Sequence, residues 1–300
     1  MKQKIKRILV LFLSSLVLFA AVSAFSGCAR RADVVIAAKN YTEQFILGYV
    51  LQILIEENTE LSTQLVSNLP SWILFQSFLS GESDVSIEYT GTITQIYFAD
   101  TTPRPPEEVF SLARSLLAEH HDIILMDRIG FNNTYTLSVR RDTAEQFNLR
   151  TISDLAAVSR QLTLGATMEF LNREDGLLGM REVYNLYFGT EIVVDGVLRY
   201  QALMNDEVQV IDAFSTEGML RAHDLVVLED DREFFPAYHA AVMIRGETLR
   251  RFPQLEAVLN SLVGTLDEYR MSELNYRVEA LHENPQNVAR SFLAELGLIP

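Results

Sequence analysis

Short apolar runs alternate along this chain with segments whose apolar residues recur at helical spacing. The first run is Asp33 to Ala38, and from Phe45 to Leu54 the apolar positions then recur every three to four residues. This combination predicts a buried strand followed by an amphipathic helix. Further strands are predicted over 63–66, 85–89, 123–126, 137–140, 162–166, 192–194, 208–213, 225–228 and 240–244. Strands and helices alternating at these lengths predict an α/β fold, with helices on both faces of mainly parallel sheets.

Two segments interrupt the alternation and predict crossings between two lobes. Ile129 to Tyr135 contains a glycine and two asparagines, residues that suit turns and unusual backbone angles. Asp230 to Tyr238 is polar and is then broken by Pro236. Ligands in open α/β sheets bind beyond the carboxyl ends of strands, so residues that follow the strands are expected to face one cleft. The crossings predict a discontinuous first lobe, 33–134 with 239–300, and a continuous second lobe, 135–238.

Three local patterns have ordinary structural interpretations. Asn40, with Glu43 three residues later, predicts a capping box at the start of the first helix. Trp72, the one tryptophan of the chain, is expected in the core. His120 and His121 are expected at a solvated helix end, because no further ligand follows at metal-binding spacing. No metal site is therefore expected.

The N-terminus has the pattern of an export signal. Four basic residues precede an apolar stretch from Ile8 to Phe25, and Ser26-Gly27-Cys28 follows. Cys28 is the single cysteine and is expected to be the lipidated first residue after cleavage, with 1–27 as signal peptide and 28–32 as linker. An uncleaved membrane helix is the alternative, since eighteen apolar residues approach a bilayer span. The lipidated form predicts an extracytoplasmic protein anchored to the cell membrane.

Composition restricts the remaining classes of function. Three hundred residues suffice for two domains. Removing residues 1–27 takes away four positive charges and no negative ones, which changes the formal charge from −15 to −19. Such an acidic body is not expected to bind nucleic acid. The chain lacks the glycine-rich phosphate or dinucleotide motifs, the nucleophile elbow and the metalloprotease motif, so neither a cofactor nor an enzyme activity is expected.

The residues near the predicted strand ends suit a ligand with a methylated nitrogen and a carboxylate. A quaternary ammonium has no N–H to donate, so aromatic faces must bind it. A carboxylate requires Lys or Arg with neutral donors. Each ring alone is also explained by core packing, and each basic residue by a surface charge. The candidates are Tyr89, Tyr135, Phe214 and Tyr238 for the cation, and Lys39, Thr92 and Arg173 for the carboxylate.

Five segments together resemble one family. They are Lys39 to Gln44, Glu88 to Thr92, Gly130 to Tyr135, Asp212 to Thr216 and Asp230 to Tyr238. In this order they are similar to the glycine betaine/carnitine/choline-binding proteins of osmoprotectant ABC importers, over nearly all of the chain after the signal. The resemblance implies a two-lobed type II periplasmic-binding-protein fold, with a mixed β-sheet flanked by helices in each lobe and a ligand cleft between the lobes. Such a protein closes on its ligand and delivers it to a membrane permease, and it is expected to work as a monomer.

The resemblance also implies roles for individual residues. The family's aromatic cage falls on Tyr89, Tyr135, Phe214 and Tyr238. Its carboxylate contacts fall on Lys39, Thr92 and Arg173. Phe214 departs from the tyrosine usual at that position, and it retains the π-face while losing a hydroxyl. Thr92 favours a zwitterion, because choline-selective relatives tend to carry an acid there.

Three other functions remain open at this point. The same fold could bind another small solute such as an amino acid. An envelope hydrolase would depend on Ser215 or His239, although no nucleophile and base are paired in the sequence. A structural or adhesive lipoprotein would tolerate replacement of the cage residues.

Overall fold

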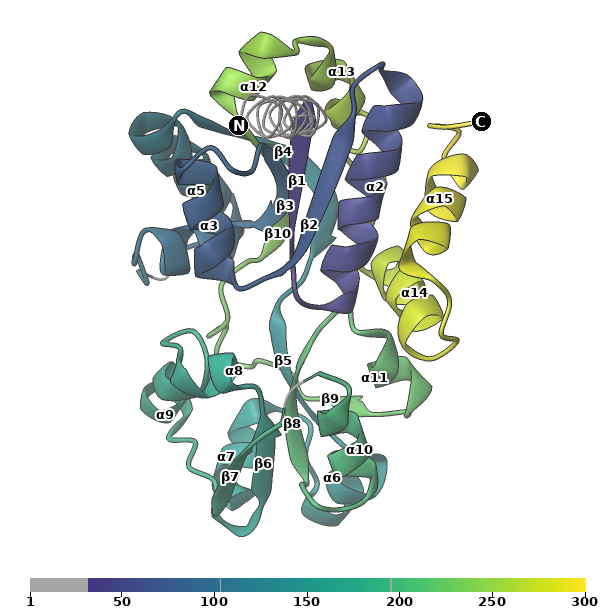
Figure 1. The fold of residues 1–300 in the computed structure, drawn as a ribbon. Coiled ribbons are helices and arrows are strands. Elements are labelled where there is room, and N and C mark those ends of the chain that lie inside the picture. The colour runs from purple at the N-terminus through teal and green to yellow at the C-terminus, as the bar shows by residue number, and fades with distance from the viewer. Residues whose placement is uncertain (1–31, 103, 195) are drawn as a thin grey trace, which may run out of the picture. The chain divides into compact units, whose positions relative to one another are not determined.

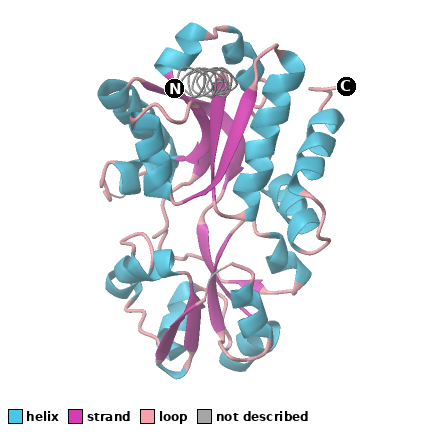
Figure 2. Cartoon of the chain, in the orientation of Figure 1, coloured by secondary structure: helices cyan, strands magenta, loops and turns pink. Residues whose placement is uncertain are grey.

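The alternating apolar runs form two five-stranded sheets. Sheet A has the order β2-β1-β3-β10-β4, and sheet B has the order β7-β6-β8-β5-β9. The strands of sheet A are β1 (Val34–Lys39), β2 (Thr63–Leu69), β3 (Val85–Tyr89), β4 (Ile123–Asn132) and β10 (His239–Arg245). Those of sheet B are β5 (Tyr135–Val139), β6 (Thr163–Ala166), β7 (Thr190–Val193), β8 (Val210–Phe214) and β9 (Val226–Val227). Helices enclose both sets of strands (Figure 2).

The structure is a computed structural model that describes residues 32–102, 104–194 and 196–300. The predicted signal peptide, Cys28 and most of the predicted linker lie outside these residues. Val34–Pro300 form one compact unit that contains both sheets. Within the described ranges, no helix combines the length and the apolar character needed to cross a membrane.

Both sheets are mixed, as the family resemblance implies, whereas the alternation of strands and helices taken alone indicates parallel sheets. In sheet A, β1 pairs in parallel with β2 and β3, whereas β10 is antiparallel to β3 and β4. In sheet B, β6 pairs in parallel with β7 and β8, whereas β5 is antiparallel to β8 and β9. The antiparallel strands flank the two crossings: β4 and β5 lie on either side of the first, and β10 follows the second.

Helices cover both faces of sheet A. In Figure 1, α2 (Thr42–Asn58), α14 (Glu268–Glu279) and α15 (Pro285–Glu295) lie on one side, and α3 (Ser71–Leu79) and α5 (Pro106–His121) lie on the other. The remaining helices near sheet A are α4 (Thr90–Thr92), the π-helical turn η1 (Ile93–Tyr97), α12 (Gly246–Arg251) and α13 (Gln254–Asn260). Those near sheet B are α6 (Arg141–Phe147), α7 (Ile152–Val158), the 3₁₀ turn η2 (Ser159–Gln161), α8 (Met168–Asn172), α9 (Leu177–Tyr184), α10 (Leu198–Met204) and α11 (Gly218–Ala222).

The first crossing is shorter than the sequence suggests. Ile129 to Asn132 belong to β4, so Asn133 and Thr134 alone separate β4 from β5. Gly130 has a φ of 135°, and a Cβ there would lie 2.8 Å from the Leu266 carbonyl oxygen. Glycine is therefore needed for close packing within a strand rather than for a turn. The second crossing lies beside the first, since the Asn133 N–H donates to the Tyr238 carbonyl at 3.0 Å.

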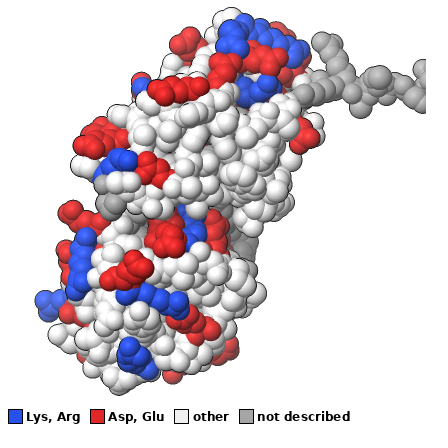
Figure 3. Space-filling view, turned by 90° about the vertical axis from the view of Figure 1, so that its left-hand side faces the viewer, with Lys and Arg blue, Asp and Glu red and all other residues white. Residues whose placement is uncertain are grey.

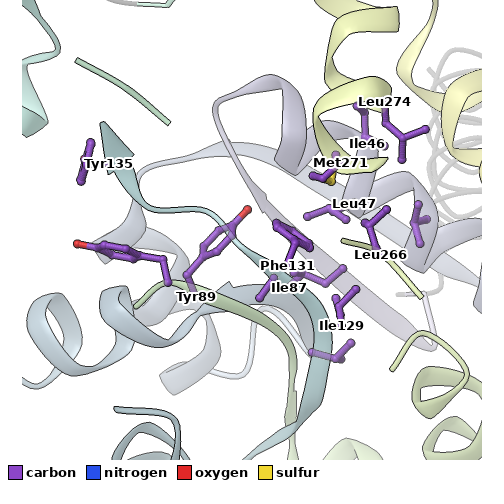
Figure 4. Close-up of a cluster of buried hydrophobic side chains, with 14 of the residues drawn as sticks. Ile46, Leu47, Ile87, Tyr89, Ile129, Phe131, Tyr135, Leu266, Met271 and Leu274 are labelled. Carbon is purple, nitrogen blue, oxygen red and sulfur yellow. The ribbon is translucent and has the colours of Figure 1, made fainter. Parts of the chain in front are cut away.

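The hydrophobic core reaches the crossings. Figure 4 shows buried side chains of α2 and α14, such as Ile46 and Leu274, continuing past Phe131 to Tyr89, with Tyr135 beyond it. The Tyr89 ring meets the Phe131 ring edge-on, with centroids 6.4 Å apart. Aromatic side chains at the crossings are thus held by the core at their bases, which fixes their orientation.

Two local predictions are wrong and one is confirmed. Tyr41, not Asn40, occupies the cap position of α2, and it makes no capping hydrogen bond through its side chain. Trp72 is 50% exposed on α3 rather than buried. His120 and His121 form the exposed last turn of α5, as the sequence indicates.

On one face of the molecule, acidic side chains lie in pairs and small groups with basic ones. Figure 3 shows one face, on which basic and acidic side chains adjoin one another among wide uncharged areas. Examples of such surface ion pairs are Arg128 with Glu107 and Arg141 with Asp224, each at 2.7 Å. Exposed pairs of this kind add little to stability.

Candidate functional site

Strand ends bring the candidate residues to the crossings. Lys39 ends β1, Tyr89 ends β3 and Phe214 ends β8. Tyr135 begins β5 and pairs directly with Phe214 across the antiparallel ladder. Side chains directly opposite each other in such a ladder are close neighbours, so the register alone places these two rings together.

A cavity of about 620 Å³ lies where these segments meet, and a smaller pocket of about 40 Å³ shares part of its wall. The smaller pocket contains all seven candidates predicted from the sequence: Lys39, Tyr89, Thr92, Tyr135, Arg173, Phe214 and Tyr238. The structure thus brings together residues separated by up to 199 positions in the sequence.

The rings stand at angles to one another around the pocket. Tyr135 lies 4.7 Å from Phe214 and 6.1 Å from Tyr238, measured between ring centroids, and it is perpendicular to Tyr238. Burial raises the pKa of Tyr89, Tyr135 and Tyr238 well above the usual tyrosine value. All three are therefore neutral phenols near pH 7, and their faces carry the negative potential that attracts a cation.

Gly91 explains how Tyr238 fits beside the Thr90-Gly91-Thr92 turn. A Cβ on Gly91 would lie 2.6 Å from Cε1 of Tyr238, so any larger residue would displace the ring. The Thr90 hydroxyl also donates to the Ala237 carbonyl at 2.8 Å. The turn after β3 and the second crossing are consequently fitted to each other, with Thr92 on the pocket wall.

Lys39 is buried in an ion pair. Its Nζ lies 2.5 Å from Glu88 Oε1 and 5.0 Å from the centre of the Tyr89 ring. Lys39 is 4% exposed and Glu88 is fully buried. The pair is held further by the Tyr97 hydroxyl, which donates to Glu88. The ammonium is therefore fixed in position before any ligand is bound.

Arg173 is held by two acids and a ring. Its Nε donates to Asp175 at 2.6 Å, its Nη1 donates to Glu169 at 2.7 Å, and its guanidinium carbon lies 5.6 Å from the centre of the Tyr135 ring. Its Nη2 donates to the Tyr238 hydroxyl at 3.2 Å. Arg173 caps the C-terminal end of α8 and does not directly follow a strand, which corrects the placement expected from sequence.

Asp212 fixes the helix that carries Arg173. Its carboxylate accepts from the Thr167 N–H at 3.1 Å and from the Thr167 hydroxyl at 2.9 Å. The Thr167 hydroxyl in turn accepts from the Phe170 N–H at 3.2 Å, which caps α8. Strand β8 thereby sets the position of α8 and of the basic side chain at its end.

The sequence interpretation missed several pocket residues. Tyr41 stacks on Phe214 with centroids 5.7 Å apart, and Asn133 and Glu169 also line the smaller pocket. Tyr41 could have been predicted, because it lies two residues after the end of β1, and residues that follow strands were expected to face the cleft. Glu43 was predicted only as part of a helix cap. Its burial beside the larger cavity could not be predicted from a single sequence.

Glu279 lines the same cavity, and its surroundings raise the pKa of its carboxyl. Burial, with the nearby Glu217 carboxylate, raises its pKa to about 8. Its carboxylate accepts from the Met219 N–H at 3.3 Å, so it joins α14 to α11. Within the described residues, no group of three or more His, Cys, Asp or Glu side chains is arranged to hold a metal ion.

A raised carboxyl pKa makes the folded state less stable as pH rises. Between pH about 4.5 and about 8 the folded protein retains the Glu279 proton that the unfolded chain has released. Stability should fall over this window by at most about 1.4 kcal/mol per pH unit. Glu279→Gln is expected to remove this slope in urea denaturation at pH 5.5 and 8, whereas exposed Glu256→Gln should keep it. Equal slopes in both variants would contradict the assignment.

A family model described as "Substrate binding domain of ABC-type glycine betaine transport system" matches residues 32–295. The match covers almost all of the chain that the structure describes. The fold agrees as well: a crystal structure of a glycine betaine/carnitine/choline ABC transporter protein superposes with a TM-score of 0.76 at 33% identity, covering 88% of this chain and 99% of the other.

Two similar proteins from named organisms have related descriptions. The carnitine transport binding protein OpuCC of Listeria monocytogenes is 32% identical over 95% of this chain and 93% of its own length. The ergothioneine transport permease/ergothioneine binding protein EgtU of Helicobacter pylori is 31% identical over 88% of this chain. The chain spans about half, 48%, of the length of that second protein.

The two mixed sheets flanked by helices, with pocket residues at the crossings, define a type II periplasmic-binding-protein fold, as predicted. The chain belongs to the OpuAC family, the substrate-binding domains of ABC-type glycine betaine transport systems. Members of this family are transport binding proteins. They lie outside the cytoplasm and work with a permease in the membrane.

Proposed function

We propose that this protein binds a zwitterionic quaternary ammonium compound: glycine betaine, carnitine or proline betaine, with choline as a possible further ligand. The supporting observation is that seven residues chosen from the sequence line one small pocket. Two relatives also support the proposal, since one is described as carnitine-binding and the other as ergothioneine-binding. Both of these compounds contain a methylated ammonium and a carboxylate.

The rings and the basic residues have separate roles in this proposal. Tyr89, Tyr135, Phe214 and Tyr238 enclose the methylated nitrogen, each face contributing about 0.5 to 2 kcal/mol. The carboxylate is bound by the basic pole, which consists of Lys39, Arg173 and the Thr92 hydroxyl. Because acids already hold both basic side chains, binding requires little reordering of either one.

The division into lobes and the anchor belong to the same proposal. Sheet A with residues 33–134 and 239–300 forms one lobe, sheet B with 135–238 forms the other, and the two close on the ligand. The chain is exported, cleaved before Cys28, lipidated there and active as a monomer next to its permease. It performs no covalent chemistry on its ligand.

A calorimetric titration of the purified protein with glycine betaine, carnitine, proline betaine, choline and ergothioneine tests the ligand class. Micromolar affinity for at least one of the zwitterions is expected, together with a rise in melting temperature that grows with ligand concentration. Binding of an unmethylated amino acid with no response to any of the five compounds would refute the proposal.

Phe214→Tyr is expected to bind glycine betaine as tightly as the natural protein or more tightly. The substitution keeps the π-face between Tyr41 and Tyr135, and Phe214 is partly exposed, so the new hydroxyl has access to water. Side-by-side titrations would measure the change. A loss greater than about threefold would mean that the phenyl edge is packed too tightly for a hydroxyl.

A further inference from the structure

Glu43 is a buried acid with an unusually complete set of donors. Its Oε1 accepts from the Tyr89 hydroxyl at 2.6 Å and from Asn133 Nδ2 at 2.8 Å. Its Oε2 accepts from the Thr216 hydroxyl at 2.6 Å and from Asn275 Nδ2 at 3.0 Å. Four donors saturate the lone pairs of a carboxylate, and a protonated acid would lose part of this match. The surroundings of Glu43 are therefore built for its ionised form.

This negative charge differs from the two acids that hold the basic residues of the pocket. Glu88 is paired with Lys39, and Asp175 with Arg173. For Glu43, by contrast, no ion pair occurs within the described residues, and neutral donors make its hydrogen bonds. Burial raises its pKa, and the four hydrogen bonds oppose that rise. A buried carboxylate with hydrogen bonds but no nearby cation favours any positive charge brought close to it.

Tyr89 connects this charge to the cage. Its hydroxyl donates to Glu43 and accepts from Gln44 Nε2 at 3.1 Å. A phenol that donates to a carboxylate gains electron density in its ring, which strengthens the attraction of its face for a cation. Glu43 also lines the cavity of about 620 Å³ directly, together with Tyr135 and Phe214.

The four donors come from separate parts of the fold. Tyr89 ends β3, Asn133 lies between the sheets, Thr216 follows β8 and Asn275 belongs to α14. Asn275 Nδ2 also donates to the Thr216 carbonyl at 2.9 Å, which keeps the N–H side of this amide toward Glu43. The carboxylate is consequently a preorganised feature of the cage.

We propose that Glu43 determines the specificity of the site for positive charge: its carboxylate attracts the ammonium of the ligand, in part by polarising Tyr89. This inference rests on the proposed function. In this role Glu43 is a positioning residue that acts through the Tyr89 ring. The site then recognises the charge of a ligand through Glu43 separately from the ligand's shape.

Ligand pairs of equal shape test this role. Choline has a positively charged nitrogen where 3,3-dimethylbutan-1-ol has a neutral carbon. Glycine betaine and 3,3-dimethylbutanoate differ in the same way. Affinities of both pairs would be measured by ligand-observed NMR, which follows millimolar binding. Glu43→Gln should weaken choline and glycine betaine by more than tenfold and change the carbon analogues by less than twofold.

Three variants separate charge from structure. Thr216→Val removes one donor but leaves the charge, so the ratio of choline to its carbon analogue should stay unchanged. Glu43→Asp retains the charge and should retain that ratio if Glu43→Gln does not fold. Tyr89→Phe keeps the ring and the acid but breaks their hydrogen bond, and should reduce the ratio severalfold.

Two results have distinct meanings. If Glu43→Gln weakens choline and its carbon analogue equally, or leaves choline unaffected, this role of Glu43 is refuted. If the natural protein binds no quaternary ammonium compound, the proposed function fails instead.

Discussion

Tyr135→Ala is expected to weaken the binding of glycine betaine by at least tenfold, about 1.4 kcal/mol. Tyr135 lies within 6.1 Å, between ring centroids, of Phe214, Tyr238 and Phe235, and the Arg173 guanidinium lies over its face. Truncation removes one face of the proposed aromatic cage and also frees the neighbouring rings to move. Isothermal titration measures the loss, with circular dichroism to confirm folding.

Two matched substitutions identify the cause of that loss. Tyr135→Phe keeps the aromatic face and should bind nearly as well as the natural protein. Tyr135→Leu keeps apolar volume without a π-system, so it should bind nearly as weakly as the alanine variant while filling more of the space. Strong binding by the leucine variant would show that shape, and not the aromatic face, holds the ligand.

Arg173→Ala is expected to weaken glycine betaine by roughly a hundredfold, about 3 kcal/mol, and choline far less. The substitution removes the proposed donor to the ligand carboxylate and also leaves Asp175, 4% exposed, without its counter-ion. An unpaired Asp175 repels a carboxylate but not a cation. Titration with both ligands measures the difference.

A second change controls for the damaged ion pair. Breaking a buried pair by removing one partner costs about 3 to 5 kcal/mol of stability. Arg173→Ala with Asp175→Asn removes both charges, so it should regain much of that stability while glycine betaine binding remains weak. Equal losses for glycine betaine and choline would mean that Arg173 does not contact the anionic end.

The sequence predicted the strand order along the chain and the pocket residues that adjoin strand ends. Tyr89, Phe214 and Lys39 all end strands, so periodicity alone brought them to the crossings. Periodicity does not give the direction of β10, because that direction depends on where the chain returns, and the mixed sheets were predicted from the family resemblance instead. Short helices such as α6 and α10, with seven residues each, lack enough turns to show a periodic pattern.

Side-chain networks were beyond the reach of one sequence. Glu43 matched the spacing of a capping box, but its partners lie 46 to 232 positions away along the chain. Trp72 was expected inside because tryptophan is apolar, yet it is half exposed on α3. The partners of Arg173 were equally hidden: Asp175 is two residues away, and only the fold shows that Asp175 is buried, and Arg173 partly buried, beside Tyr238.

The enclosed ion pairs bear on the conditions in which such a protein must work. Cells accumulate compatible solutes when the medium is concentrated, and at about 1 M salt the electrostatic screening length shrinks to about 3 Å. Surface attractions vanish there, but Lys39–Glu88 and Arg173–Asp175 are shielded from dissolved ions by the protein around them. A binding site whose charges are enclosed in this way should retain its affinity for the ligand at high salt, the condition in which uptake of compatible solutes is most needed.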